Sequence, residues 1–216
     1  MAGRGLFVVF EGGEGAGKST QVQQLATRLQ DQGRDVVVTR EPGGVPTAEA
    51  IRSLLLDTRS AGLDPRAEAL LFAAARAEHV ARLIRPAMSR GAVVICDRYT
   101  DSSVAYQGLG RGLGVRRIAE LSAWATDGLL PDATVVLDVD PSLGLVRAGR
   151  GQTPLDRMES EPAQFHDQVR RAFLDRADAD PDRYLVIDAA GGRRQIAAQI
   201  GDYIDSLLMR HEQNNG

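Results

Sequence analysis

The stretch FVVFEGGEGAGKST, residues 7–20, decides the fold of this chain. It joins a short apolar run, residues 6–10, to a glycine-rich turn and then to a segment with helical spacing, residues 18–30. A continuous apolar run that stops at glycines is typical of a buried strand, and Gly33 gives the following helix a natural end. The stretch therefore predicts a strand, a tight loop and a helix in direct succession.

The loop fits the pattern G-x-x-x-x-G-K-[ST] of a phosphate-binding loop. Its glycines permit positive φ angles, so backbone N–H groups can converge on phosphate oxygens beside the positive end of the helix. Lys18 is the only lysine, and the other 25 basic residues are arginine. We interpret this as a steric requirement, because a compact ammonium group fits where a planar guanidinium does not. The residues expected to bind a nucleotide tail are Gly12, Gly13, Glu14, Gly15, Ala16, Gly17, Lys18, Ser19 and Thr20.

Strand-like and helical segments alternate along the rest of the chain. Further strands are expected at residues 35–39, 92–96, 133–139 and 184–187. Further helices are expected at residues 115–126, 161–179 and 194–210, and from residues 65 and 140 onward. Pro86 is expected to bend or end the helix that starts at residue 65. This alternation implies right-handed crossovers and an α/β fold, with a mostly parallel sheet covered by helices on both faces. We expect one domain, residues 1–216, whose polar end, residues 211–216, frays.

Composition narrows the environment and the partners. The formal net charge of −3 argues against a nucleic-acid polymer or an anionic membrane as the main partner. A single cysteine, Cys96, cannot form an internal disulfide and suits a reducing compartment, where we expect it to be a buried thiol. No stretch approaches the roughly 20 apolar residues of a membrane span. We therefore expect a cytoplasmic protein.

A phosphate-binding loop leaves three uses of the nucleotide open: a switch, a motor or a small-molecule kinase. Guanine-reading switches need a second lysine in an N-K-x-D motif, which this chain does not have. A motor is expected to be larger or to show a coupling partner. A kinase needs a second site that holds an acceptor.

The stretch VVICDRYTDSSVAYQGLGRG, residues 93–112, supplies such a site. A buried strand ends there in Asp97 and Arg98, and a guanidinium suits bidentate capture of a phosphate. Upstream, Phe72 and Arg76 lie four residues apart on one helix face, where a ring and a guanidinium could form a pocket for a base. A core position for Phe72 and a surface ion pair for Arg98 are the alternatives.

Together these motifs resemble the bacterial thymidylate kinases. The resemblance covers essentially the whole chain and rests on FVVFEGGEGAGKST, TREPGG, LLFAAAR, DRYTDSSVAYQG, LDVDP and LDRME. It implies a three-layer phosphate-loop fold, with a five-stranded parallel sheet surrounded by helices and a mobile lid at residues 147–160. It also implies a homodimer that uses ATP and Mg²⁺ to convert dTMP to dTDP.

The resemblance assigns roles by matching position. It implies that Phe72 stacks on thymine, that Arg76 contacts the edge of the base, and that Arg98 holds the acceptor phosphate. Glu14 would face the deoxyribose 3′-OH, and Tyr106 would occupy the place of a ribose 2′-OH. The remaining acceptor residues would be Arg40, Glu41, Arg52, Ser102, Ser103 and Gln107, and the Mg²⁺ ligands would be Ser19 and Asp97.

Members of this family place a catalytic arginine either in the phosphate loop or in the lid. Gly15 stands at the loop position here, so the lid arginines are the candidates. We expect Arg150 to be catalytic, with Arg157 as the alternative and Arg147 beside the ATP phosphates. A kinase for another nucleoside monophosphate or deoxynucleoside, or a non-catalytic nucleotide-binding regulator, remains open, because Phe72 and Arg76 do not by themselves exclude uracil.

Overall fold

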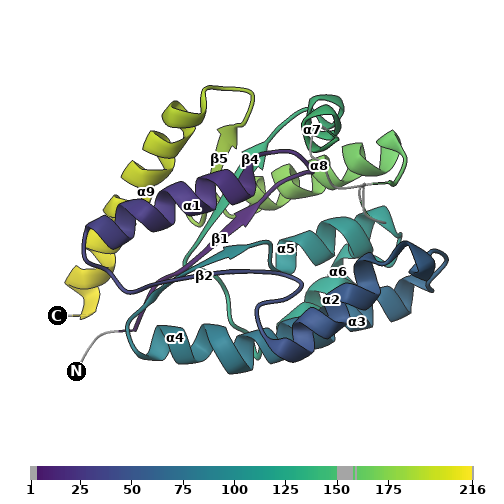
Figure 1. Ribbon diagram of the computed structural model, residues 1–216, viewed down its shortest axis with the longest axis horizontal. Helices are drawn as coiled ribbons and strands as arrows, with labels where there is room; N and C mark the ends of the chain where they lie inside the picture. Colours follow the sequence, from purple (N-terminus) through teal and green to yellow (C-terminus); the bar gives the residue numbers. More distant parts are fainter. Residues whose placement is uncertain (1–3, 150–157, 159, 216) are drawn as a thin grey trace.

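The computed structural model describes residues 4–149, 158 and 160–215 of the chain. Five parallel strands form one sheet in the order β2-β3-β1-β4-β5 (Figure 1). The strands are β1 (Phe7–Glu11), β2 (Val36–Arg40), β3 (Val93–Asp97), β4 (Ala133–Asp138) and β5 (Tyr184–Asp188). Each lies within one residue of an expected strand at both ends, so the predicted parallel α/β fold is confirmed.

Helices cover both faces of this sheet (Figure 1). The α-helices are α1 (Lys18–Asp31), α2 (Pro46–Leu56), α3 (Pro65–His79), α4 (Arg85–Ser89), α5 (Thr100–Ser103), α6 (Val115–Ala125), α7 (Pro141–Ala148), α8 (Ala163–Ala179) and α9 (Arg193–Asn215). Shorter helical turns are the 3-10 turn η1 (Thr58–Ser60) and the π-helical turns η2 (Val80–Ile84) and η3 (Val104–Gly110).

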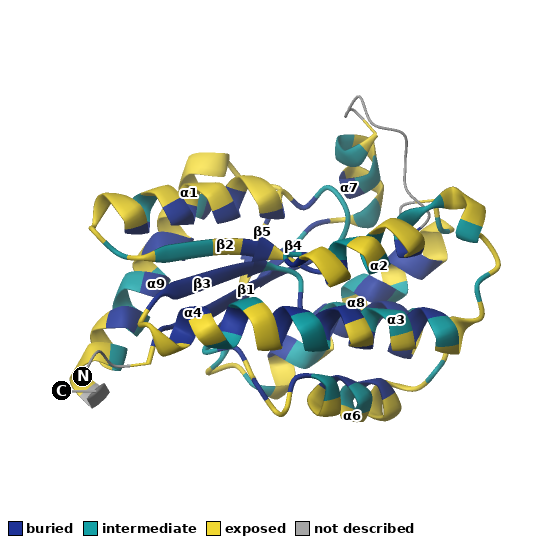
Figure 2. Ribbon diagram, turned by 60° about the horizontal axis from the view of Figure 1, so that its bottom comes forward, coloured by how far each residue is buried: buried dark blue, intermediate teal, exposed yellow. Residues whose placement is uncertain are grey.

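Alternate residues along the central strands build two separate apolar layers. Val8 and Phe10 of β1 pack with α1 and α9 on one face, whereas Phe7 and Val9 pack with η2 and α4 on the other. The helix α8 and the turn η3 extend the second layer over β4 and β5. Figure 2 shows β1 and β3 buried along nearly their whole length, as expected of strands covered on both faces. Because β1 and β3 are buried at the centre of the sheet, the loops that begin at their carboxyl ends start from fixed points.

Several elements differ from the sequence-based expectations. Pro86 lies just inside α4, and the wider turn η2 precedes it and accommodates a residue without a backbone N–H. The helix α9 continues through residues 211–215, which we expected to fray, and Glu212 there pairs with Arg34 at 2.9 Å. The helix α2 and the turn η3 were not anticipated, because their glycine- and proline-bearing surroundings hide the helical spacing.

Candidate active site

A cavity of about 820 Å³ opens at the carboxyl ends of the strands, where ligands of such sheets collect. It runs from the phosphate loop to the helices that follow β2 and β3. The expected site residues that line it are Glu14, Gly15, Ala16, Gly17, Lys18, Ser19, Thr20, Arg40, Glu41, Arg52, Phe72, Arg76, Asp97, Arg98, Ser102, Ser103, Tyr106, Gln107 and Arg147. Residues that the sequence assigned to two different ligands therefore share one continuous space.

The phosphate loop curls around the amino group of Lys18. Gly12 and Gly17 take φ angles of 138° and 92°, which residues with side chains rarely adopt. The Nζ atom of Lys18 donates to the carbonyl oxygens of Gly12 at 3.1 Å and Gly13 at 2.9 Å, and the side chain is buried. Burial lowers the pKa of Lys18 and Arg98 adds to this, while the nearby Asp97 and Glu14 oppose it. The loop thus holds a single, fixed cation at its centre.

Gly15 sits against the helix α7. A Cβ atom at this position would lie 1.9 Å from the carbonyl oxygen of Gly144, and the φ angle of Gly15 is 64°. A side chain therefore cannot be added here unless the loop or α7 moves. This gives a physical reason for the absence of an arginine from the loop.

Ser19 and Asp97 meet at the first turn of α1. The Oγ atom of Ser19 donates to Oδ2 of Asp97 at 3.1 Å. The other carboxylate oxygen, Oδ1, is buried and has no hydrogen-bond partner among the described residues. An unpartnered carboxylate oxygen beside a hydroxyl is the oxygen donor set that Mg²⁺ prefers, so the two residues fit the metal assigned to them.

Arg98 stands immediately after β3 with a φ angle of 71°, an uncommon conformation for a residue with a side chain. Its Nη1 atom donates to the Gly12 carbonyl at 3.1 Å and to Ser102 Oγ at 3.2 Å, and its Nη2 atom donates to Glu14 Oε1 at 2.7 Å. Within the described part of the chain these contacts use three of the five guanidinium N–H groups. Nε–H and the second Nη2–H take no part in these three bonds, and Arg98 lines the cavity, so its guanidinium has further donors for a phosphate there.

Glu14 links Arg98 to the wall of the cavity. Its Oε1 atom also accepts a hydrogen bond of 2.7 Å from the hydroxyl of Tyr106, whose ring lies 5.1 Å from the Arg98 guanidinium carbon. Burial alone would raise the pKa of Glu14, but the positive charges of Arg98 and Lys18 and the Tyr106 hydroxyl together lower it to about 2. Glu14 is therefore an anion at neutral pH, held in one orientation.

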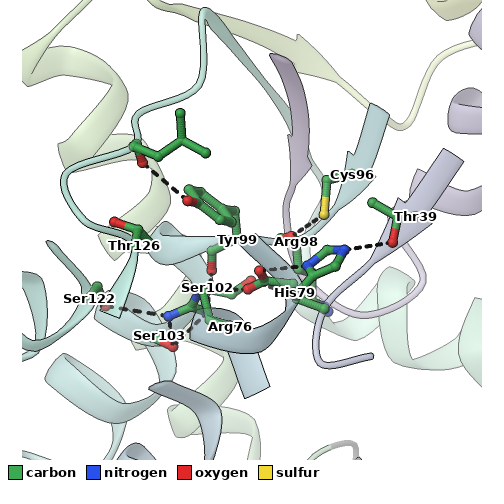
Figure 3. A network of polar contacts seen from close by, with 12 residues as sticks. Thr39, Arg76, His79, Cys96, Arg98, Tyr99, Ser102, Ser103, Ser122 and Thr126 are labelled. Atoms are coloured by element: carbon green, nitrogen blue, oxygen red, sulfur yellow. Dashed lines mark hydrogen bonds and ion pairs between the residues drawn. The ribbon is translucent and has the colours of Figure 1, made fainter. Parts of the chain in front are cut away.

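Arg76 is buried in a polar network at the other end of the cavity (Figure 3). Its Nε atom donates to Glu41 Oε2 at 2.6 Å, and Glu41 Oε1 lies 3.0 Å from Nδ1 of His79, whose Nε2 atom is 2.7 Å from Thr39 Oγ1. The Nη atoms donate to Ser103, Ser122 and the carbonyl of Tyr99. All five N–H groups of this guanidinium are engaged, whereas the three bonds of Arg98 engage three of its five, so Arg76 is a fixed part of the wall.

The other expected acceptor residues surround these two arginines. Arg40 forms an ion pair with Glu49 at 3.0 Å, and Arg52 donates to the carbonyl of Pro42 at 2.9 Å. Gln107 donates to the buried Glu68 at 2.9 Å. Phe72, one helical turn before Arg76 on α3, lines the cavity and is only half-buried, so it is not a core residue.

The three arginines expected in the lid have different outcomes. Arg150 and Arg157 lie outside the described residues. Arg147, at the end of α7, donates from Nη1 to the carbonyl of Ala189 at 2.8 Å. Sequence reasoning missed that Gly191, in the turn after β5, and Arg193, the first residue of α9, also line the cavity. The signal was available, since this glycine-bearing turn follows the carboxyl end of a strand in the same sheet.

Comparison with known proteins places this site in a family. The family described as thymidylate kinase matches residues 10–200. The chain belongs to the thymidylate kinase family. Among similar thymidylate kinases are that of Clavibacter michiganensis, 54% identical over 94% of this chain and 96% of the relative, and that of Pseudomonas fluorescens, 53% identical over 94% and 95%.

The thymidylate kinase fold is matched as well. A crystal structure of thymidylate kinase from Ehrlichia chaffeensis aligns with a TM-score of 0.71 and 36% identity, over 85% of this chain and 93% of that one. The resemblance inferred from the sequence motifs is thereby confirmed. Among the described residues, no helix has both the length and the apolar character needed to cross a membrane.

Proposed function

We propose that this chain transfers the γ-phosphoryl group of ATP to dTMP and releases ADP and dTDP. One observation carries the proposal: a single cavity joins the phosphate loop, the guanidinium of Arg98 and the Phe72–Arg76 wall. A donor tail on the loop and an acceptor phosphate on Arg98 would then meet inside that space. Family membership names the two substrates.

The chemistry is mainly electrostatic. The acceptor is a phosphate monoester with a second pKa near 6, so it is largely a dianion at pH 7 and needs no general base. The obstacle is the repulsion between two anions that must approach in line. Lys18 is buried, Arg98 is largely shielded from solvent, and both donate to the Gly12 carbonyl. Two such preorganised cations beside the phosphate loop stabilise the negative oxygens of the transition state.

We assign Mg²⁺ binding to Ser19 and Asp97, on the strength of the unpartnered Oδ1 atom of Asp97. When bound there, the ion would neutralise charge on the donor phosphates. The protein contributes the orientation, because the Ser19 hydroxyl is held on Asp97 before any ligand arrives.

The acceptor's sugar and base would lie against Glu14, Tyr106 and the Phe72–Arg76 wall. Glu14 would face the 3′-OH, and the rigid Tyr106 ring would occupy the space of a 2′-OH, which favours a deoxyribose. Ser102, Ser103, Gln107, Arg40, Glu41 and Arg52 complete this end of the cavity. Because Arg76 already uses every donor, it would reach a base edge only by exchanging one of its contacts with Ser103, Ser122 or Tyr99.

We assign the remaining positive charge at the transferring group to the lid and favour Arg150, with Arg157 as the alternative. The crowding of Gly15 against Gly144 supports a lid arginine, since the loop position cannot hold one. Arg150→Ala is expected to lower kcat more than it raises the KM for dTMP. Loss of kcat in Arg157→Ala but not in Arg150→Ala would move the assignment to Arg157.

We also propose a homodimer in the cytoplasm. Large apolar side chains are exposed on the helices α2, α3 and α6, which pack beside one another: Leu54 at 50%, Leu70 at 57% and Trp124 at 82%. Exposed apolar groups gathered on neighbouring helices are typical of an interface with another protein. Light scattering is expected to give twice the mass of one chain, and a monomer would refute the assignment.

A coupled ADP-release assay tests the activity directly. Purified protein with ATP and Mg²⁺ is given dTMP, dUMP, UMP, CMP, AMP or GMP in turn. We expect the highest kcat/KM with dTMP and much less turnover with the ribonucleotides. A preference for another acceptor would replace the proposed substrate, and ATP and dTMP binding without ADP release would favour a regulatory protein.

A further inference from the structure

Glu11, the last residue of β1, is a fully buried carboxylate to which the proposed reaction assigns no role. Its Oε1 atom accepts the backbone N–H groups of Tyr99 at 2.9 Å and Ser102 at 3.1 Å. Its Oε2 atom accepts the hydroxyl of Ser102 at 2.6 Å. A buried carboxylate is costly unless it is well partnered, so three converging donors mark Glu11 as a built feature of the fold.

These donors lie directly after Arg98, in the segment that must hold it. A left-handed conformation is unfavourable for a residue with a side chain, and Arg98 takes one. The surrounding backbone offsets this cost, because Arg98 N–H donates to the Phe10 carbonyl at 2.9 Å and the next N–H, that of Tyr99, is held by Glu11. Residues 10 and 11 of β1 therefore fix the backbone on both sides of the strained position.

The side chain of Arg98 is held through Ser102. Because the Ser102 hydroxyl hydrogen is donated to Glu11, its oxygen is left to accept from Arg98 Nη1 at 3.2 Å. Glu11 thus determines that the Ser102 hydroxyl donates its hydrogen to the carboxylate and accepts one from Arg98. This keeps Nη1 turned toward Ser102 and the Gly12 carbonyl, and so fixes the orientation of the guanidinium.

We propose that Glu11 is a positioning residue for the acceptor phosphate: through Tyr99 and Ser102 it holds the backbone and the guanidinium of Arg98 in the orientation that captures a phosphate. This rests on the proposed function, in which Arg98 binds the phosphate of dTMP. Glu11 itself touches neither nucleotide. Its effect therefore reaches dTMP through Arg98, and we expect it to be larger on the phosphate than on the base or the sugar.

The test compares the binding of dTMP and thymidine by calorimetry, because the two ligands differ only in the phosphate. In Glu11→Gln the amide Oε1 can still accept both backbone N–H groups, but Nε2 donates to Ser102 Oγ and competes there with Arg98. One hydrogen bond to a charged group is worth about 1.5–3 kcal/mol, roughly a tenfold to hundredfold change. We expect dTMP affinity to fall by about tenfold or more while thymidine affinity is retained.

Glu68→Gln is the matched control. Glu68 is another buried carboxylate, and it accepts hydrogen bonds from Gln107 and Arg111. We expect the same ratio of dTMP to thymidine affinity as in the wild type, even if both affinities change. A control that shifts this ratio as much as Glu11→Gln would overturn the proposal, since any buried charge would then have the same effect.

Ser102→Ala breaks the link to the guanidinium but leaves both backbone contacts of Glu11. It is expected to lower the dTMP-to-thymidine ratio too, and the double variant is expected to lower it no further than Glu11→Gln alone. Additive losses, or an unchanged ratio in Glu11→Gln, would overturn the proposal. A wild-type protein that binds dTMP no better than thymidine would instead contradict the proposed function itself.

Discussion

Lys18→Arg preserves the charge in the phosphate loop and changes only its shape. In the structure the lysine ammonium lies 3.1 Å and 2.9 Å from two loop carbonyls, and the side chain is 7% exposed. A guanidinium brings three nitrogens and a planar fork into a space that holds one nitrogen. It would displace the loop amides or point away from the phosphates.

The expected loss follows from the role of this cation. Removing one preorganised donor to a developing negative charge costs about 3–4 kcal/mol, which corresponds to 10²–10³ in rate. We expect kcat for dTMP to fall by about that factor in Lys18→Arg. The fall should match that of Lys18→Met, because the arginine charge would be present but misplaced.

The assay is coupled ADP release at saturating ATP and dTMP, with thermal unfolding measured in parallel. A midpoint of unfolding close to that of the wild type would show that the loss of rate is not a loss of fold. A kcat near the wild-type value in Lys18→Arg would refute the steric reading of the only lysine in the chain.

Three further outcomes are expected from the phosphate loop and its neighbours. Tyr106→Phe removes the 2.7 Å hydrogen bond to Glu14 but keeps the ring. The free energy of unfolding in urea should therefore fall by about 1.5–3 kcal/mol, while the preference for dTMP over UMP is retained. Loss of that preference would assign the discrimination to the hydroxyl. Gly15→Ala should weaken ATP binding at least tenfold, because its Cβ would lie 1.9 Å from the Gly144 carbonyl oxygen. The control is Gly13→Ala, whose Cβ would have no heavy atom of a described residue within 4 Å, its chain neighbours apart. Equal ATP affinities of the two variants in calorimetry would contradict the crowding at Gly15. The folded-state pKa of Glu14 is about 2, below its ordinary value of 4.5, so its ionisation stabilises the fold above pH 4.5. This contribution of about 3 kcal/mol is lost as the pH falls toward 2. If the unfolding free energies of the wild type and Glu14→Gln fell equally between pH 5 and 3, this linkage would be refuted.

The sheet and the donor site could be predicted from the sequence because their signals are local. The run FVVFEGGEGAGKST contains the strand, the loop and the start of α1, and each is specified by residues within a few positions of one another. The buried strands are likewise continuous apolar runs. Parallel pairing then brings Glu11 and Asp97 to the same edge of the sheet, which places β3's carboxyl end beside the loop.

What the sequence could not show depends on contacts between distant segments. The sequence does not distinguish the guanidinium of Arg76 from that of Arg98. In the structure, Arg76 donates to Glu41, Tyr99, Ser103 and Ser122 with all of its N–H groups, whereas Arg98 makes three such bonds to Gly12, Glu14 and Ser102. Likewise, nothing local to Glu11 indicates that its partners lie 88 and 91 residues further along the chain. Such roles follow only from the folded arrangement of side chains.

A crystal structure with dTMP and a non-hydrolysable ATP analogue tests the central claim most directly. The account predicts a triphosphate cradled by the loop amides and Lys18, with the dTMP phosphate on the guanidinium of Arg98. One acceptor oxygen should lie within about 3–3.5 Å of the γ-phosphorus. A triphosphate bound away from residues 12–19, or an acceptor phosphate held by other residues than Arg98, would contradict it.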